Sequence, residues 1–285
     1  SERSLREPLA RRDAELVEDD LPAAVWTDRP PLPHAPVYEH PLEYATRSRF
    51  DKLGDVRKAM LEAGATHHFV SALDEIAWVL NLRGSDVEYN PVFLSHLLLD
   101  ANGATLFVEA AKFDDALQTA LAADGIRLAP YASAVDALSK LPPGAKLLLA
   151  PAQVAAALAH AIPPHTAMIE APGPITAAKA RKGAKAMQHV REAMRREGVA
   201  LVRGARWLEQ SLRDGKRLTE LDVDTKLREL RSQQPGFVSE SFSTIAGYEA
   251  NAALPHYSAT PESHSELKPR GMLLIDSGAQ YLGGT

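Results

Sequence analysis

The alternation of short helix-like and strand-like segments from Arg49 onward is the feature that most limits the fold of this chain. The stretch SRFDKLGDVRKAMLEAG places Leu53, Val56 and Met60 on one helical face and ends at a glycine. Strand-like and helix-like patterns then follow one another along the sequence. Such alternation is typical of a layered α/β domain, which we expect to cover residues 49–172.

Three local patterns within this region make definite predictions. The dipeptide Asn102-Gly103, common in tight hairpins, separates two apolar runs and predicts a pair of strands. Asp74 lies near the expected N-cap of a helix with the sequence DEIAWVLNL. Farther on, the strand-like AKLLLAP leads into an Ala-rich helix that is expected to have Pro151 in its first turn.

The remainder of the chain, residues 173–285, has a different order of elements. A Pro-Gly-Pro break at 172–174 is followed by two long helical patterns, and strand-like segments come only after them. The second helical pattern opens with Thr219 and Asp222 at capping-box spacing. This order favours an α+β unit. The last strand leads into a glycine turn without a partner strand, so we expect the unit to be incomplete.

Residues 1–48 are rich in proline and predict an extended linker and remnant of a preceding domain, with a disordered tail as the alternative.

The overall composition and the first residues of the sequence argue against several classes of protein. A net charge of -5 argues against a nucleic-acid partner, and the absence of cysteine excludes disulfides and thiolate ligands. The charged start lacks a signal peptide, and no apolar run reaches the ~20 residues that span a bilayer. We expect a soluble cytoplasmic protein.

Asp276 is the first candidate site residue, because it ends the apolar run MLLI just before Ser277-Gly278. A lone carboxylate beside a strongly apolar strand is costly unless it is paired or bound to a cation. Two interpretations stay open: a strand-end Asp that caps the turn, and a metal ligand. The second needs further ligands, and no Asp, Glu or His follows Asp276.

His256, in the strand-like segment NAALPHYSAT, is the second candidate. An imidazole suits proton transfer near neutral pH, and Pro255 and Tyr257 restrict its backbone. A structural histidine is the alternative. His67-His68 are adjacent in a predicted strand, so they point to opposite faces and do not easily share one ion. The polar loop LRGSDVEYNP, with Arg83 and Asp86, is expected either at the surface or at the mouth of a cleft.

Four segments together resemble aminopeptidase P, the Xaa-Pro aminopeptidase family of M24 metallopeptidases, in its long multidomain form. They are LDEIAWVLNLRGSDVEYNPVF (73–93), QQPGFVSESFSTIAG (233–247), NAALPHYSATPESH (251–264) and LLIDSGAQYLGGT (273–285). The resemblance implies a creatinase-like α/β domain followed by a pita-bread catalytic domain. That domain holds two divalent metal ions, usually manganese, between two Asp, one His and two Glu.

The resemblance also assigns roles to residues of this chain. Asp276 matches the first metal-binding Asp, and the remaining ligands are expected beyond residue 285. His256 matches a catalytic histidine that touches the substrate outside the metal shell, and Phe242 matches an aromatic residue lining the pocket for the substrate's N-terminal side chain. Ser243 and Ala252 depart from the family pattern, and Ala252 bears on how His256 is presented.

The implied activity is hydrolysis of the bond between an N-terminal residue and a following proline. The implied partners are peptides with proline at the second position and, in the intact protein, a second copy of the chain. The sequence is expected to be truncated at both ends, and a chain with one metal ligand is expected to be inactive. The alternatives are a related pita-bread hydrolase of the Xaa-Pro dipeptidase or creatinase type, and a non-catalytic pita-bread binding protein.

Overall fold

The structure, a computed structural model, describes residues 2–17, 19 and 21–285. The chain divides into two compact units, each of which is described by itself. The first unit comprises the residues up to Glu39, Arg47–Asp86 and Val92–Arg181. The second comprises His40–Thr46, Val87–Pro91 and Lys182–Thr285.

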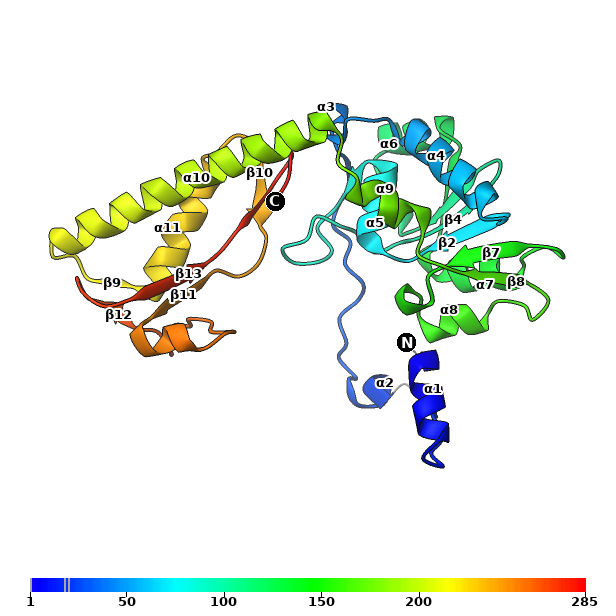
Figure 1. Ribbon diagram of the computed structural model, residues 1–285, viewed down its shortest axis with the longest axis horizontal. Helices are drawn as coiled ribbons and strands as arrows, with labels where there is room; N and C mark the ends of the chain where they lie inside the picture. Colours follow the sequence, from blue (N-terminus) through cyan, green and yellow to red (C-terminus); the bar gives the residue numbers. More distant parts are fainter. Residues whose placement is uncertain (1, 18, 20) are drawn as a thin grey trace. The chain divides into compact units, whose positions relative to one another are not determined.

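A six-stranded mixed sheet forms the middle of the first unit (Figure 1). Its strand order is β6-β5-β4-β2-β7-β8. β4 pairs antiparallel with β2 and β5, and the other pairs are parallel. The strands are β2 (His67–Val70), β4 (His96–Asp100), β5 (Ala104–Phe107), β6 (Ile126–Ala129), β7 (Lys146–Leu149) and β8 (Ala167–Glu170).

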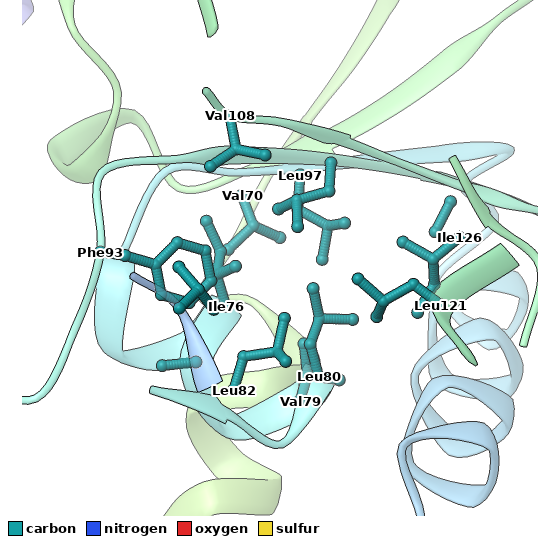
Figure 2. Packing of buried hydrophobic residues seen from close by; sticks show 14 of the residues in the cluster. Val70, Ile76, Val79, Leu80, Leu82, Phe93, Leu97, Val108, Leu121 and Ile126 are labelled. Atoms are coloured by element: carbon teal, nitrogen blue, oxygen red, sulfur yellow. The ribbon is translucent and has the colours of Figure 1, made fainter. Parts of the chain in front are cut away.

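Helices cover both faces of this sheet, and each face has its own buried apolar cluster. Figure 2 shows Leu97 of the sheet pointing toward Leu80 of α5 and Leu121 of α6. The predicted layered α/β domain is therefore confirmed. One face carries α4 (Arg49–Glu62), α5 (Leu73–Leu80), α6 (Asp115–Ala123) and α9 (Pro174–Ala180), and the other carries α7 (Ala134–Ser139) and α8 (Ala156–His160).

The residues before Arg49 contain short elements that the proline-rich sequence did not indicate. β1 (Tyr38–Glu39) pairs antiparallel with β3 (Leu82–Arg83), because Val37 beside it is buried in the apolar cluster of the first unit. The other elements of this segment are α1 (Glu2–Ala10), α2 (Leu21–Val25) and α3 (Leu42–Ala45).

The hairpin prediction is confirmed, since β4 and β5 pair across Asn102-Gly103. The Asp100 carboxylate accepts the backbone N–H groups of Asn102 at 2.7 Å and Gly103 at 2.8 Å, which fixes the turn. The N-cap prediction for Asp74 is wrong. Ala72 occupies that position, and Asp74 lies in the first turn of α5, where the helix dipole favours a carboxylate.

The predicted Ala-rich helix after Pro151 is interrupted. Pro151 opens a 3₁₀ turn, η3 (Pro151–Gln153), and α8 begins only at Ala156. Val154 and Ala155 between them have extended backbone angles, so the helix cannot run through. The remaining 3₁₀ turns of this unit are η1 (Ala110–Lys112) and η2 (Tyr131–Ser133). In the described part of the chain, no helix combines the length and the apolar character needed to cross a bilayer.

The second unit is built on α10 (Ala184–Arg213) and α11 (Glu220–Ser232), which pack side by side (Figure 1). The predicted capping box at Thr219 and Asp222 is confirmed. Three antiparallel strand pairs and a 3₁₀ turn, η4 (Glu249–Ala253), complete the unit. The pairs are β9 (Leu218–Thr219) with β12 (Glu266–Leu267), β10 (Phe237–Glu240) with β14 (Ala279–Tyr281), and β11 (Ile245–Tyr248) with β13 (Leu273–Asp276).

The strand-like segment GMLLIDSGAQY forms two strands. The chain turns at Ser277-Gly278 and changes sheet, so β13 pairs with β11 and β14 pairs with β10, both earlier in the sequence.

Lys52 of α4 is a buried cation, with 3% of its surface exposed. Its Nζ donates to the Trp78 carbonyl at 2.9 Å and to Asn81 Oδ1 at 2.6 Å, and lies 4.3 Å from the centre of the Trp78 ring. Burial, together with the nearby Arg83 and Arg47, lowers the pKa of Lys52 to about 7.

This pKa predicts that the stability of the first unit rises with pH. Between pH 7 and 10.5 the unfolded chain holds a proton at Lys52 that the folded chain has released. We expect Lys52→Met to remove this rise, which amounts to at most about 1.4 kcal/mol per pH unit for one proton. Urea unfolding at several pH values measures the slope. The exposed Lys58 of the same helix is the control, and equal slopes for wild type and Lys52→Met would contradict the prediction.

Candidate functional site

Asp276 is the last residue of β13, opposite Ile245 of β11, and its side chain is exposed. The apolar residues before it are also partly exposed, with Leu274 at 42% and Ile275 at 41%. The expected cost of a carboxylate on a strongly apolar strand therefore does not arise here, because water reaches the strand. Among the described residues, the Asp276 side chain makes no hydrogen bond that would cap the following turn.

The turn after Asp276 lies directly against Phe242. A Cβ built on Gly278 would be 2.6 Å from Ser241 Oγ and 3.5 Å from Phe242 Cε1, so a side chain at this position would require Ser241 to rotate away. The backbone N–H of Ser241 donates to the Gly278 carbonyl at 3.0 Å. The structure thus brings two of the predicted site residues, Phe242 and Asp276, to the same turn.

A buried ion pair lies under this turn. Arg231, fully buried on α11, donates from Nε to Glu197 of α10 at 2.9 Å and from Nη2 to Ser277 Oγ at 2.8 Å. The Tyr281 hydroxyl donates to the other oxygen of Glu197 at 3.0 Å. Burial and the Glu197 charge raise the pKa of Tyr281. We call Arg231, Glu197, Ser277 and Tyr281 the Arg231 anchor, since they hold the turn at both ends.

His256 lies in a turn after η4 and not in the strand that the sequence suggested. The segment leaves the extended conformation because Glu249 adopts a left-handed backbone angle, with φ 54°, and η4 begins there. His256 itself is exposed, whereas the neighbouring Tyr257 is buried at 8% exposure.

Tyr257 leads to a second buried carboxylate, Glu220, which is fully buried at the start of α11. The Tyr257 hydroxyl donates to Glu220 Oε2 at 2.6 Å, and the Asn251 side chain donates to Oε1 at 3.1 Å. The backbone N–H groups of Tyr248, at 2.6 Å, and Ser265, at 2.7 Å, also donate to Glu220. We call these five residues the Glu220 anchor.

The two pKa shifts in the Glu220 anchor have opposite directions. Burial on its own would raise the pKa of Glu220, but hydrogen bonds from Tyr257, Tyr248, Ser265 and Asn251 lower it overall, so the charged form is retained. Burial, assisted by the Glu220 charge, raises the pKa of Tyr257 to about 12, so the phenol stays a donor at neutral pH.

Glu220 and Arg231 were not singled out from the sequence, although a signal exists. The buried apolar residues of α11 include Val223 and Leu227. Residues three or four positions apart lie on the same face of a helix. Glu220 is three residues before Val223, and Arg231 is four residues after Leu227, so both charged residues lie on the buried face of α11. A charged residue on an apolar helix face indicates a buried, paired group.

The structure does not join His256 directly to the other two candidates. η4, which precedes His256, packs against β11 and β13, but no hydrogen bond links the His256 side chain to Asp276 or Phe242 in the described part of the chain. His67 and His68 have separate partners, the Thr66 hydroxyl and the Leu148 carbonyl, in line with opposite faces of β2.

A dinuclear metal centre needs more donor groups than the described residues bring together. Within residues 2–17, 19 and 21–285, no three His, Asp or Glu residues come together in a way that could hold an ion. Asp276 is exposed and offers one carboxylate. A pair of divalent ions needs several oxygen or imidazole ligands. The described residues alone therefore do not fit such a centre.

The polar loop LRGSDVEYNP has an anchored base and a tip that belongs to the second unit. At the base, Asp86 forms a buried ion pair with Lys112 and accepts the Leu94 N–H at 2.6 Å. At the tip, the Tyr89 carbonyl accepts from the Gln280 side chain at 3.2 Å. The tip therefore contacts β14, the strand that follows the Asp276 turn.

The Arg231 anchor predicts a large loss of stability when its cation is removed. Arg231→Met leaves the Glu197 carboxylate buried without its partner, so we expect the free energy of unfolding to fall by roughly 3–5 kcal/mol. Replacing Glu197 as well, with leucine, should recover much of this loss. Denaturant unfolding measures both changes. Arg213→Met, at an exposed arginine of α10 paired with the exposed Glu209, is the control, with an expected loss below about 1 kcal/mol. Equal losses for the two arginines would contradict this account.

Sequence comparison finds two families along the chain. Residues 28–185 match the family described as Creatinase/Prolidase N-terminal domain, and residues 188–285 match Metallopeptidase family M24. The chain is 35% identical to Aminopeptidase P2 of Arabidopsis thaliana, over 99% of this chain and 44% of that protein. It is also 35% identical to a Probable Xaa-Pro aminopeptidase P of Paracoccidioides brasiliensis (strain Pb18), over 99% of this chain and 48% of that protein. The chain thus spans about half the length of these relatives.

Comparison of structures finds the same relationship. The X-prolyl aminopeptidase from Caenorhabditis elegans, described as a cytosolic enzyme with a di-nuclear active site, superposes with a TM-score of 0.91 at 28% identity. The match covers 99% of this chain and 47% of that one. The Xaa-Pro dipeptidase from Bacillus anthracis matches with a TM-score of 0.59 at 17% identity, over 82% of this chain and 62% of that one, and so shows a shared fold alone.

Proposed function

This chain belongs to the creatinase/prolidase N-terminal domain family, as the resemblance to aminopeptidase P implied for its first domain, and we propose that it is part of an Xaa-Pro aminopeptidase. The proposed enzyme hydrolyses the bond between an N-terminal residue and a following proline. We assign residues 49–172 to its creatinase-like domain, residues 173–285 to its pita-bread domain, and residues 1–48 to a linker.

One observation carries the proposal: Asp276, Phe242 and the loop with His256 belong to one unit, in a chain with 28% identity and a TM-score of 0.91 to an X-prolyl aminopeptidase. Phe242 lies against Gly278, two residues after Asp276. Asp276 is exposed at the end of a strand and its oxygens have no protein partner among the described residues, so they are free to bind a cation.

We assign each of the three residues one role. Asp276 is a metal ligand, and His256 is a catalytic group that hydrogen-bonds or transfers a proton to the substrate. Phe242 lines the pocket for the side chain of the N-terminal residue. Divalent ions, when bound, would supply a hydroxide nucleophile and a Lewis acid for a tertiary amide that has no N–H of its own. We propose manganese as the metal, because carboxylate-rich sites suit hard ions.

Three further assignments follow from the family relationship. We propose that the centre is completed by ligands that this chain does not supply, that the intact enzyme is a homodimer, and that it works in the cytoplasm. The last is in line with the C. elegans relative, which is described as cytosolic. The alternative hydrolases are favoured less, because the relatives at 35% identity over 99% of this chain are an aminopeptidase P and a probable Xaa-Pro aminopeptidase P. No observation favours a non-catalytic protein.

Activity is tested on the protein at the full length of its relatives, with manganese and the peptide Arg-Pro-Pro. We expect release of arginine, and no release from Arg-Ala-Ala. Asp276→Asn should lower kcat/KM by more than about 100-fold, beyond the usual effect of residues that only support a ligand. His256→Gln should lower it by about 10²–10⁴-fold. Glu262→Gln, at an exposed loop residue, is the control. A folded, manganese-loaded protein that cleaves no Xaa-Pro peptide would refute the proposed function.

The 285-residue chain by itself should not bind two manganese ions. One exposed carboxylate at Asp276 cannot replace the water ligands of two ions, so we expect calorimetry to give fewer than two sites per chain. Titration of Asp276→Asn alongside the wild type identifies any heat that comes from this residue. Two tight sites in the 285-residue chain would show that its own residues assemble the centre.

A further inference from the structure

Glu220 is a fully buried carboxylate whose hydrogen-bond donors come from both sides of the loop that carries His256. Tyr248 and Asn251 precede His256, whereas Tyr257 and Ser265 follow it. A single side chain of α11 therefore closes the loop from 248 to 265. We propose that Glu220 is a positioning residue, which fixes the exposed His256 imidazole through the adjacent Tyr257.

The charge of Glu220 is what this arrangement requires. A carboxylate offers only acceptors, and its four partners offer only donors to it: two backbone N–H groups, one amide and one phenol. No Lys or Arg forms an ion pair with Glu220 in the part of the chain that the structure describes. The start of α11 adds a favourable dipole for the negative charge.

Glutamine at position 220 would have nearly the same shape as glutamate but would replace one acceptor oxygen by a donor nitrogen. Its amide nitrogen is a donor and would face the N–H of Tyr248 or Ser265, or the hydroxyl of Tyr257. Glu220→Gln therefore removes acceptors without removing volume. Tyr257→Phe is a milder change, because it takes away one donor and leaves the carboxylate with three partners.

The Glu220 anchor and the Arg231 anchor share no residue. The first holds the His256 loop, and the second holds the turn after Asp276 through Ser277 and Tyr281. Each anchor contains one buried carboxylate, Glu220 or Glu197, that can be replaced by glutamine. Glu220→Gln and Glu197→Gln are therefore matched variants: the first should affect the His256 loop, and the second should affect the turn after Asp276.

The test follows amide hydrogen exchange and the imidazole Cε1–H resonance of His256, which is identified by its loss in His256→Gln. In Glu220→Gln the backbone amides of Tyr248 and Ser265 lose a charged acceptor, so the segment that contains them opens more easily. We therefore expect both amides to exchange about tenfold faster or more. The His256 resonance should shift or broaden. The amides that flank the Asp276 turn should keep their rates. Tyr257→Phe should change the same signals by less.

Glu197→Gln should give the reverse pattern, with faster exchange from Ser277 to Tyr281 and an unchanged His256 resonance. The inference is overturned if Glu220→Gln and Tyr257→Phe leave the His256 resonance at its wild-type position, or if Glu197→Gln moves it equally. The inference rests on the proposed function only for the role of His256. These readouts need no enzymatic activity, so a failure here is distinct from a failure to cleave Xaa-Pro peptides.

Discussion

The organisation of the second unit depends on one constraint, that a charged group taken out of water must have partners for its donors and acceptors. α11 carries two such groups, Glu220 at its first residue and Arg231 near its last. They are separated by about 16 Å of helix, at 1.5 Å per residue. Each gathers polar groups from segments distant in sequence. One short helix thereby fixes both the His256 loop and the Asp276 turn, although neither candidate residue is buried.

The first unit is stabilised mainly by apolar packing between its sheet and its helices. Its sheet is covered on both faces by helices, and apolar side chains from the two meet in separate clusters. Buried charges occur there as well, at Lys52 and in the Asp86–Lys112 pair. They stabilise particular connections, such as the base of the polar loop, and not the layers themselves, which are stabilised by burial of apolar surface.

Much of the first unit could be predicted from the sequence, because apolar spacing decides which face of each helix and strand is buried. The hairpin at Asn102-Gly103 and the capping box at Thr219 are local features, and both are confirmed. Some predictions were wrong for local reasons, because Ala72 is the N-cap of α5 and extended residues interrupt the helix after Pro151. β14 pairs with β10 across many intervening residues, and His256 lies in a turn because η4 forms before it.

The candidate site was found through resemblance, which named Asp276, His256 and Phe242 but not the groups beneath them. A methyl group added at Gly278 would meet the Ser241 hydroxyl at 2.6 Å. That oxygen ends a short side chain that can rotate away, so the contact is relieved without a shift of the backbone. The Phe242 ring, 3.5 Å from the same point, would then lie beside the new side chain. Substitution at Gly278 would therefore change the surface next to the carboxylate while leaving the turn itself in place.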